Sequence, residues 1–427
     1  MPSYWASNPS KLLTSSRIHS LHLATGDRVL ASILPVLESA EEEVIFVTCY
    51  WARSPSQEQI CDSLRKLSAK AVTRSRKIRV RICFSSSGIW QKLFHTQLPD
   101  GKLYSPGSWS TALGLPEPKE LEGLDMEVKS IFLLPISIIH PKFIVVDRKH
   151  AFLPSCNVSW ENWFEGCVEL SGPVVSQFVR FWQAFWAREQ IGKAAAWEHH
   201  DSRTHDLSQP SPGMLSSRVL QLSDVQAIFL PSPHHRDPRF RFPWQTAAPA
   251  PLTPLNIFLL QAFEHAKKYI YIQTPNVTSQ PVISSILTAL ERGVDVNIVT
   301  SEKLQLLEQI VTAGTTSPRC VGRLTAEHQS RVQMQDVESG RRGRLKVSFY
   351  MAQNGREGCD EQPVQSHFKL TIVDGDVAVF GSGNMDRPSW YTSQELGVAF
   401  FSEEFVEQVE NALSESLEGR LKQAYVG

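Results

Sequence analysis

The alternation of apolar and polar positions follows the same order twice along the chain. Apolar side chains at helical spacing occupy residues 29–40, and a strand-like apolar run follows at 44–50. The same order, helix and then strand, returns at residues 255–266 and 269–274. This repetition indicates that the second half of the chain copies the first.

The repeat continues beyond these first elements. After each strand comes a polar turn, a second amphipathic helix and another buried strand. These elements are predicted at residues 57–71 and 78–84 in the first half, and at 282–292 and 294–300 in the second. Strands that alternate with helices are typical of α/β folds. We therefore expect two α/β lobes related by duplication.

Length and composition agree with this division. At 427 residues and 42% hydrophobic, the chain is long enough to bury two cores of ordinary size. Residues 199–212 are rich in His, Asp, Ser and Pro and have no periodicity, which is typical of a linker. We expect an N-terminal lobe over residues 24–198, a linker over 199–218 and a C-terminal lobe over 219–427.

The strongest chemical signal is a motif that occurs once in each half. The two copies run from His140 to Asp147 and from His367 to Asp374, and each reads His-x-Lys-x4-Asp. The apolar run inside each copy alternates like a buried strand, so the histidine and lysine should point to one face of a sheet. Downstream of each copy come a Ser-x-Asn sequence and a glutamate. The serines, asparagines and glutamates are Ser155, Asn157 and Glu169 in the first half, and Ser382, Asn384 and Glu395 in the second.

These motifs resemble those of the phospholipase D superfamily, whose signature is His-x-Lys-x4-Asp followed by Gly-Ser-x-Asn. The second copy, with Met385-Asp386-Arg387 after the asparagine, is most similar to the cardiolipin-synthase-type branch. The first copy has Pro154 where the family usually has glycine. The resemblance implies duplicated α/β/α lobes with mixed sheets, related by a pseudo-twofold axis, with one active site at their interface.

The resemblance also implies residue roles. One histidine would attack phosphorus and the other would protonate the leaving alcohol, with His140 as nucleophile and His367 as general acid. The side chains that would hold the phosphoryl oxygens are Lys142, Lys369, Asn157 and Asn384, with Ser155 and Ser382 nearby.

Elementary chemistry requires the same groups. Hydrolysis of a phosphodiester needs neutralisation of the phosphoryl charge, a nucleophile and a proton donor. The two histidines must titrate apart, and a carboxylate behind each ring, for which Glu169 and Glu395 are the candidates, would favour the imidazolium. Asp147 and Asp374 are expected at strand ends, where they would tie the backbone together. Trp160 and Trp163 could form an apolar wall for acyl chains, a stacking platform for bases, or plain packing.

Charge and cysteine content limit the alternatives. The net charge is −1, so no overall field recruits nucleic acid, although seven cations lie between Lys66 and Arg81.

Seven cysteines without a close pair indicate reduced thiols in an intracellular protein, cytoplasmic or peripheral to a membrane. The first 26 residues faintly resemble a mitochondrial transit segment, and a disordered tail is the favoured interpretation. No carboxylate cluster is placed for two metal ions, so we expect no metal and no cofactor.

The sequence therefore predicts a monomeric enzyme that hydrolyses or transfers phosphatidyl groups of phospholipids through a phosphohistidine. Peripheral membrane contact is compatible with this function. Two alternatives stay open: a nuclease or DNA-end phosphodiesterase of the same superfamily, and an inactive module that binds phospholipid or nucleic acid.

Overall fold

The computed structural model describes residues 9–96, 98, 100–133, 138–187, 213–235, 249–333, 342–353 and 362–427. The described residues divide into two compact units, the first extending to Phe229 and the second beginning at Leu230. Most of the expected linker, residues 199–212, lies outside the described residues. Its last residues, from Ser216, already belong to a strand of the first unit. The expectation of a disordered tail before residue 24 was wrong for Leu13–Thr25, which form a strand of the same sheet because they pair on both sides.

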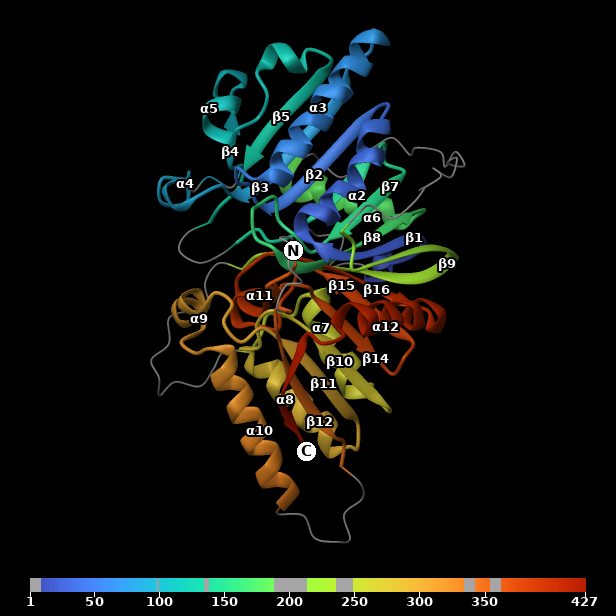
Figure 1. The fold of residues 1–427 in the computed structure, drawn as a ribbon, viewed down its shortest axis with the longest axis vertical. Helices are drawn as coiled ribbons and strands as arrows, with labels where there is room; N and C mark the ends of the chain where they lie inside the picture. The colour runs from blue at the N-terminus through green and yellow to red at the C-terminus, as the bar shows by residue number, and fades with distance from the viewer. Residues whose placement is uncertain are drawn as a thin grey trace. The chain divides into compact units, whose positions relative to one another are not determined.

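The first unit is built around one mixed sheet (Figure 1). Hydrogen bonding orders its strands β4-β5-β3-β2-β6-β7-β8-β1-β9, with β5, β3 and β2 parallel to one another. The strands are β1 Leu13–Thr25, β2 Glu43–Tyr50, β3 Ile78–Ser86, β4 Lys102–Tyr104, β5 Leu124–Ser130, β6 Phe143–Val146, β7 His150–Pro154, β8 Trp163–Ser171 and β9 Ser216–Ser232. The α-helices are α2 Gly26–Ser39, α3 Pro55–Thr73, α4 Ile89–Leu93, α5 Trp109–Leu113 and α6 Val174–Trp182.

Helices cover both faces of this sheet. The apolar stripes of α2 and α3 pack with alternate residues of the strands, such as Ile144 and Val146 of β6, in one core. Phe143, directly before Ile144 and on the opposite face, contacts Phe178 and Phe181 of α6. The alternation along β6 therefore produces three layers, helix, sheet and helix.

The second unit repeats the order of the first. Its sheet runs β17-β12-β11-β10-β14-β15-β16, again with three parallel strands beside an antiparallel group. The strands are β10 Tyr269–Gln273, β11 Asp295–Thr300, β12 Leu345–Tyr350, β13 Gln365–Ser366, β14 Leu370–Val373, β15 Val377–Gly381, β16 Glu395–Phe401 and β17 Leu421–Val426. The helices are α7 Pro254–His265, α8 Gln280–Glu291, α9 Leu306–Ala313, α10 Ser317–Gln333, α11 Arg387–Tyr391 and α12 Glu403–Leu417.

The matching strand orders confirm the predicted duplication. β2, β3, β6, β7 and β8 correspond in order to β10, β11, β14, β15 and β16. The helices predicted at residues 29–40, 57–71, 255–266 and 282–292 are α2, α3, α7 and α8, with ends that differ by a few residues. The mixed sheets and duplicated α/β lobes are therefore confirmed.

Candidate active site

The histidine and lysine of each motif lie just before a strand, not within it as the sequence predicts. β6 begins at Phe143 and β14 begins at Leu370. In the first unit Pro141 separates the two side chains and has no N–H to donate to a sheet ladder. Phe368 takes its place in the second unit and β14 also begins after the lysine, so the late start does not depend on proline. Because Val47 pairs with Phe143 and Gln273 with Leu370, each motif lies at the sheet edge where its parallel strands end.

Both motif lysines are buried. The side chain of Lys142 is held by a 3.1 Å hydrogen bond from its Nζ to the carbonyl oxygen of His140. Lys369 Nζ donates to the carbonyl of His367 and lies 2.9 Å from His367 Nδ1. Within the described part of the chain, no carboxylate forms an ion pair with Lys142. An ammonium that is taken out of water without a counter-charge is costly, so this position favours binding of an anion.

A serine and a glutamate form the same contact in both units. Ser155 Oγ donates a short hydrogen bond to Glu165, and accepts one from the N–H of Gly166 at 2.9 Å. In the second unit Ser382 Oγ donates to Glu395 at 2.5 Å and accepts from the N–H of Leu396 at 3.1 Å. The serine hydroxyl therefore fixes a buried carboxylate at the same point of each sheet.

This arrangement assigns the equivalent of Glu395 to Glu165 and not to Glu169. Glu169 Oε1 lies 3.3 Å from Nδ1 of His150, and its Oε2 accepts from Ser20 at 3.1 Å. The register of β7 against β8 causes the difference, because Ser155 is bonded to Gly166, next to Glu165. A sequence signal did exist: Glu165 and Glu395 are each followed three residues later by valine.

Glu169 has an environment of its own. Burial raises the pKa of its carboxyl, but the hydrogen bond with His150, the nearby charges of His19 and His150 and the Ser20 hydroxyl outweigh burial, and the net pKa lies below the ordinary value. Burial also lowers the pKa of His19 and of His22, which Glu169 partly offsets. These contacts are typical of a buried polar network that supports the sheet.

The two motif asparagines each have an open acceptor. Within the described residues, Oδ1 of Asn157 and Oδ1 of Asn384 are buried and have no hydrogen-bond partner. Asn384 Nδ2 donates to Asp386 at 2.9 Å, and Asp386 also caps α11 by accepting from the N–H of Ser389. Burial raises the pKa of Asp386 despite those hydrogen bonds. Asp386 therefore orients Asn384, a role that the sequence analysis did not give it although it named Asp386 as part of the resemblance; the signal was the Asn-x-Asp spacing.

The last residue of each motif binds backbone. Asp147 accepts from the N–H groups of Glu41, Glu42 and Glu43 at 2.7 to 2.9 Å. Asp374 accepts in the same way from Lys267, Lys268 and Tyr269. Both aspartates have a positive φ, 51° and 57°. Each holds the turn that enters the neighbouring parallel strand.

The unusual residues of the first motif are accommodated. Pro154 ends β7, and the next N–H still bonds across to β8, as in the second unit. A Cβ built on Gly26 of α2 would lie 3.1 Å from the Cβ of Cys156, and one built on Gly383 would lie 3.1 Å from Leu255 of α7. In the first unit the glycine is on the helix and the larger residue is in the motif, and in the second unit the arrangement is the reverse.

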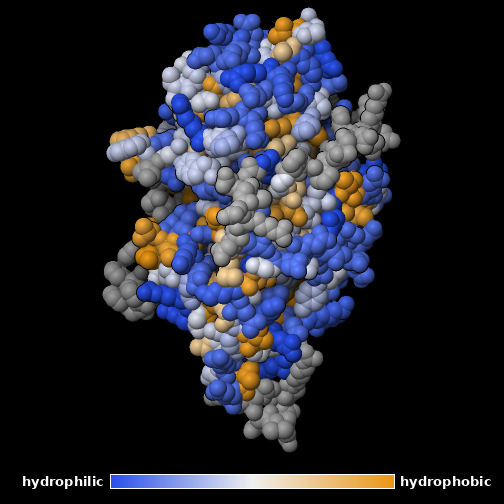
Figure 2. Space-filling model, in the orientation of Figure 1, coloured by the Kyte–Doolittle hydropathy of each residue, from blue (hydrophilic) through white to orange (hydrophobic). Residues whose placement is uncertain are grey.

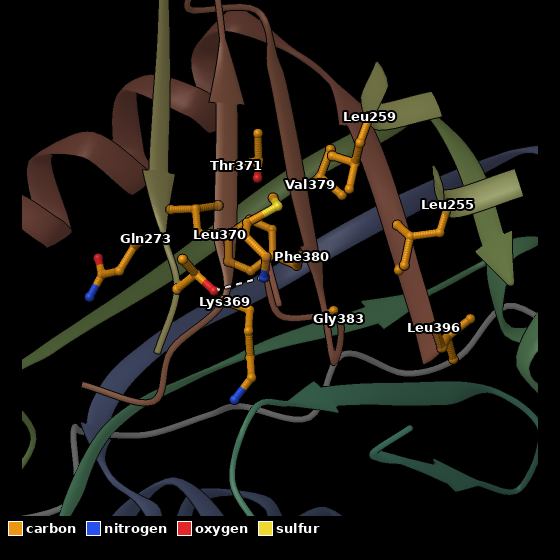
Figure 3. A pocket seen from close by; sticks show the side chains of 14 residues that line it. Leu255, Leu259, Gln273, Lys369, Leu370, Thr371, Val379, Phe380, Gly383 and Leu396 are labelled. Atoms are coloured by element: carbon orange, nitrogen blue, oxygen red, sulfur yellow. Dashed lines mark hydrogen bonds between the residues drawn. The ribbon is translucent and has the colours of Figure 1, made fainter. Parts of the chain in front are cut away.

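The surroundings of the motifs differ between units. In the first, Trp160 is 57% exposed and its ring meets the edge of the Tyr50 ring, while Trp163 is half-buried at the start of β8. In the second, Lys369 points its ammonium away from Leu255 and Leu259 (Figure 3). The cavity between these leucines and the sheet has a volume of about 20 Å³, which suits a water molecule and not a lipid.

Four other features of the sequence can be compared with the described residues. The cations between Lys66 and Arg81 mostly pair with acids, as in the Arg74–Glu41 and Arg76–Glu42 ion pairs. No group of three or more His, Cys, Asp or Glu side chains in the described ranges is arranged to hold a metal ion. The six cysteines that the structure describes are buried and form no disulfide. None of the described helices is long and apolar enough to cross a membrane.

Comparison with known proteins places the sequence and the fold. Residues 259–417 match the family described as cardiolipin synthase, PLD-like domain. Cardiolipin synthase A of Pseudomonas putida (strain GB-1) is 24% identical over 294 residues, which are 65% of this chain and 47% of that protein. The corresponding protein of Pseudomonas entomophila is 22% identical over 289 residues, 64% of this chain and 46% of that protein. The chain thus spans about half the length of the curated relatives that it matches.

Solved structures extend the likeness to the whole chain. Phosphatidylserine synthase of Haemophilus influenzae Rd KW20 superposes with a TM-score of 0.59 at 14% identity, over 96% of this chain and 89% of that one. Polyphosphate kinase of Porphyromonas gingivalis gives a TM-score of 0.50 at 10% identity, over 94% and 48%. At these identities the likeness is one of fold. It agrees with the resemblance that the two motifs indicated.

Proposed function

We propose that this chain, a member of the phospholipase D superfamily, is an enzyme that hydrolyses or transfers phosphodiesters, with phospholipids as the substrate class. The observation that carries the proposal is that one constellation is built twice. Each unit has a buried lysine beside a histidine, a serine bonded to a buried glutamate, and an asparagine with an open acceptor. The names of the cardiolipin synthase relatives support the lipid class.

The reaction needs both halves of the constellation. In the proposed first step a ring nitrogen of His140 attacks phosphorus, the bond from phosphorus to the leaving oxygen breaks, and His367 gives its proton to that oxygen. In the second step an acceptor hydroxyl attacks the phosphohistidine, the nitrogen–phosphorus bond breaks, and His367 takes the hydroxyl proton. Neither motif contains a nucleophile and an acid at once, so we propose that one histidine from each unit serves a single phosphate.

The other motif groups would act on charge and position. Lys142 and Lys369 would neutralise the phosphoryl oxygens, and the second amide hydrogen of Asn384 would donate to one of them. Glu165 and Glu395 would orient the histidines, which places Glu165 in the role first expected of Glu169. The nuclease alternative is less favoured, because the strongest run of cations in the sequence is paired with acids on the surface.

A product screen tests the proposal. Purified protein is incubated with mixed phospholipids, single-stranded DNA or double-stranded DNA, with and without EDTA, and with glycerol or ethanol present. We expect phosphatidic acid or transphosphatidylated lipid, no loss of rate in EDTA, and loss of turnover in His140→Ala. Cleavage of DNA but of no lipid would support the nuclease instead, and loss of activity in EDTA that Mg²⁺ restores would contradict the histidine mechanism.

A further inference from the structure

Each unit carries a short helix whose apolar side chains face solvent. α4 follows β3 in the first unit and α9 follows β11 in the second, and these two strands occupy the same place in the two sheets. Large exposed apolar side chains gather on both segments. They are Trp90, Leu93 and Phe94 on and after α4, and Leu307, Ile310 and Val311 on α9. Figure 2 shows apolar surface at the positions that these helices occupy in Figure 1.

α4 has its polar and apolar sides reversed relative to an ordinary surface helix. Trp90 is 74% exposed and Phe94 is 82% exposed, and the two rings stack with centroids 6.3 Å apart. The inward side is polar: Gln91 lies within hydrogen-bond distance of Ser130, and the buried ring of His95 bonds to Ser130 at 2.8 Å. A helix on the surface of a globular protein normally buries its apolar side. The reversed orientation of α4 therefore indicates that an apolar partner outside the chain covers it.

α9 has the same reversal. Leu307 is 80% exposed and Val311 is 76% exposed, whereas Gln309 is buried. The Gln309 amide donates to Oδ1 of Asn276 at 2.8 Å and accepts from the N–H of Ser317 at 2.6 Å. A buried, hydrogen-bonded glutamine therefore fixes the helix with its apolar side outward.

The position of the two helices points to the substrate. Both follow the ends of parallel strands, which is the sheet edge where the motif of the same unit lies. Charge points to the same partner, since Lys92 lies against the Phe132 ring and Lys102 against the Tyr104 ring beside the apolar side chains of the first unit. Tryptophan and phenylalanine flanked by lysine are the side chains that favour the boundary between lipid tails and anionic head groups.

We propose that α4 and α9 bind the surface of an anionic phospholipid bilayer and present each motif edge to the lipid. The proposal rests on the proposed function only in that the bilayer supplies the substrate. If the partner were a protein, there would be no reason for both units to carry a reversed helix at the equivalent position. A bilayer accounts for both, because it offers one apolar layer to every helix that reaches it.

Vesicle binding by the full chain is the test. Co-sedimentation is measured with vesicles of phosphatidylglycerol and phosphatidylcholine in equal amounts, and with phosphatidylcholine alone. The variants are Trp90→Ser with Phe94→Ser, and Leu307→Ser with Val311→Ser. Val72→Ser and Val332→Ser, at exposed valines on α3 and α10, are the matched controls. Turnover of the water-soluble diester bis(p-nitrophenyl) phosphate is measured for each protein.

We expect each double variant to bind the anionic vesicles at least about tenfold more weakly, the effect of withholding one large apolar side chain from a lipid phase. Turnover of the soluble diester should be unchanged, and the controls should bind as the parent does. The proposal is overturned if the parent does not bind vesicles, or if the variants bind them as well as the parent does. It is also overturned if the parent self-associates without binding vesicles and the substitutions abolish that self-association. Vesicle binding without turnover of any diester would retain this proposal and reject the proposed function.

Discussion

At the scale of single residues, the buried carboxylates separate into two kinds. Glu165 and Glu395 are each held by a motif serine, whereas Glu169 lies among His150, His19 and Ser20. We propose that the first kind orients a reacting group. The second belongs to a network of titratable side chains that stabilises the sheet, so substitution should separate activity from stability.

Glu165→Gln should lower kcat by on the order of 100-fold, because a reacting group that loses its orientation by about 1 Å loses about that much. Glu169→Gln should change kcat little. Turnover of bis(p-nitrophenyl) phosphate by the two variants, with circular dichroism to confirm folding, measures this. Equal losses in the two variants would return Glu169 to the catalytic role that the sequence suggested.

The pH dependence of the free energy of unfolding should reveal the contribution of Glu169 to stability. Its folded pKa lies below the ordinary value of 4.5, so its contribution to stability is complete above about pH 4.5 and is lost as the pH falls through the folded pKa. Glu169→Gln should therefore be less stable than the parent near neutral pH, by about 1–3 kcal/mol, and the difference should shrink in acid. Urea unfolding at a series of pH values tests the sign; a difference that grows in acid would contradict it.

At the scale of elements, the first turns of α2 and α7 pack against their motifs with a small and a large residue in opposite arrangement. Gly26 faces Cys156 in the first unit, and Leu255 faces Gly383 in the second. In both units one member of the pair is glycine, on the helix in the first and in the motif loop in the second. The glycine leaves room for the larger partner, and the bond between the motif serine and Glu165 is retained.

A double-mutant cycle should expose this coupling. Gly26→Leu alone places side-chain atoms into Cys156 and should destabilise the protein by about 1–3 kcal/mol. Cys156→Gly added to it removes the side chain that the new leucine overlaps and should recover most of that loss, with a coupling free energy of about 0.5–3 kcal/mol. Free energies of unfolding in urea measure all four proteins. Additive effects would show that the two positions do not share this space.

At the scale of the whole molecule, the duplicated units raise the question of one site or two. Each unit supplies one histidine, one buried lysine and one fixed carboxylate, in the same order along equivalent sheets. If the groups of both units act on one phosphate, one unit supplies the nucleophile and the other the general acid of a single reaction. If each unit acted alone, each would have its own complete site.

Kinetics of His140→Ala, His367→Ala and the double variant should distinguish these cases. Residues that act as a unit are non-additive, so the double variant should be no worse than the more damaging single variant. His367→Ala should lose less on bis(p-nitrophenyl) phosphate than on a lipid, since general-acid help, worth about 10²–10⁴-fold, matters less for a good leaving group. Single variants that each keep half of the activity would indicate two independent sites.

The sequence by itself determined the first two helices and strands of each half, the duplication and the His, Lys, Ser and Asn positions. Periodicity and motif spacing are local properties, and a repeat compares one stretch of chain with another without any knowledge of contacts. The pairs of helices and strands in each half were therefore predicted with small errors at their ends. The starts of β6 after Lys142 and of β14 after Lys369 were not predicted. They depend on where the pairing with the neighbouring strand ends, at Val47 and Gln273, which the alternation along the motif does not show.

Only the tertiary structure decided which carboxylate serves the first motif and which way α4 and α9 face. Glu165 and Glu169 are four residues apart on β8 and share a face, so alternation cannot separate them; the register that bonds Ser155 to Gly166 does. Helical periodicity likewise finds the apolar side of α9 but not its direction. That direction follows from the hydrogen bonds of Gln309 to Asn276 and Ser317, residues brought together by folding.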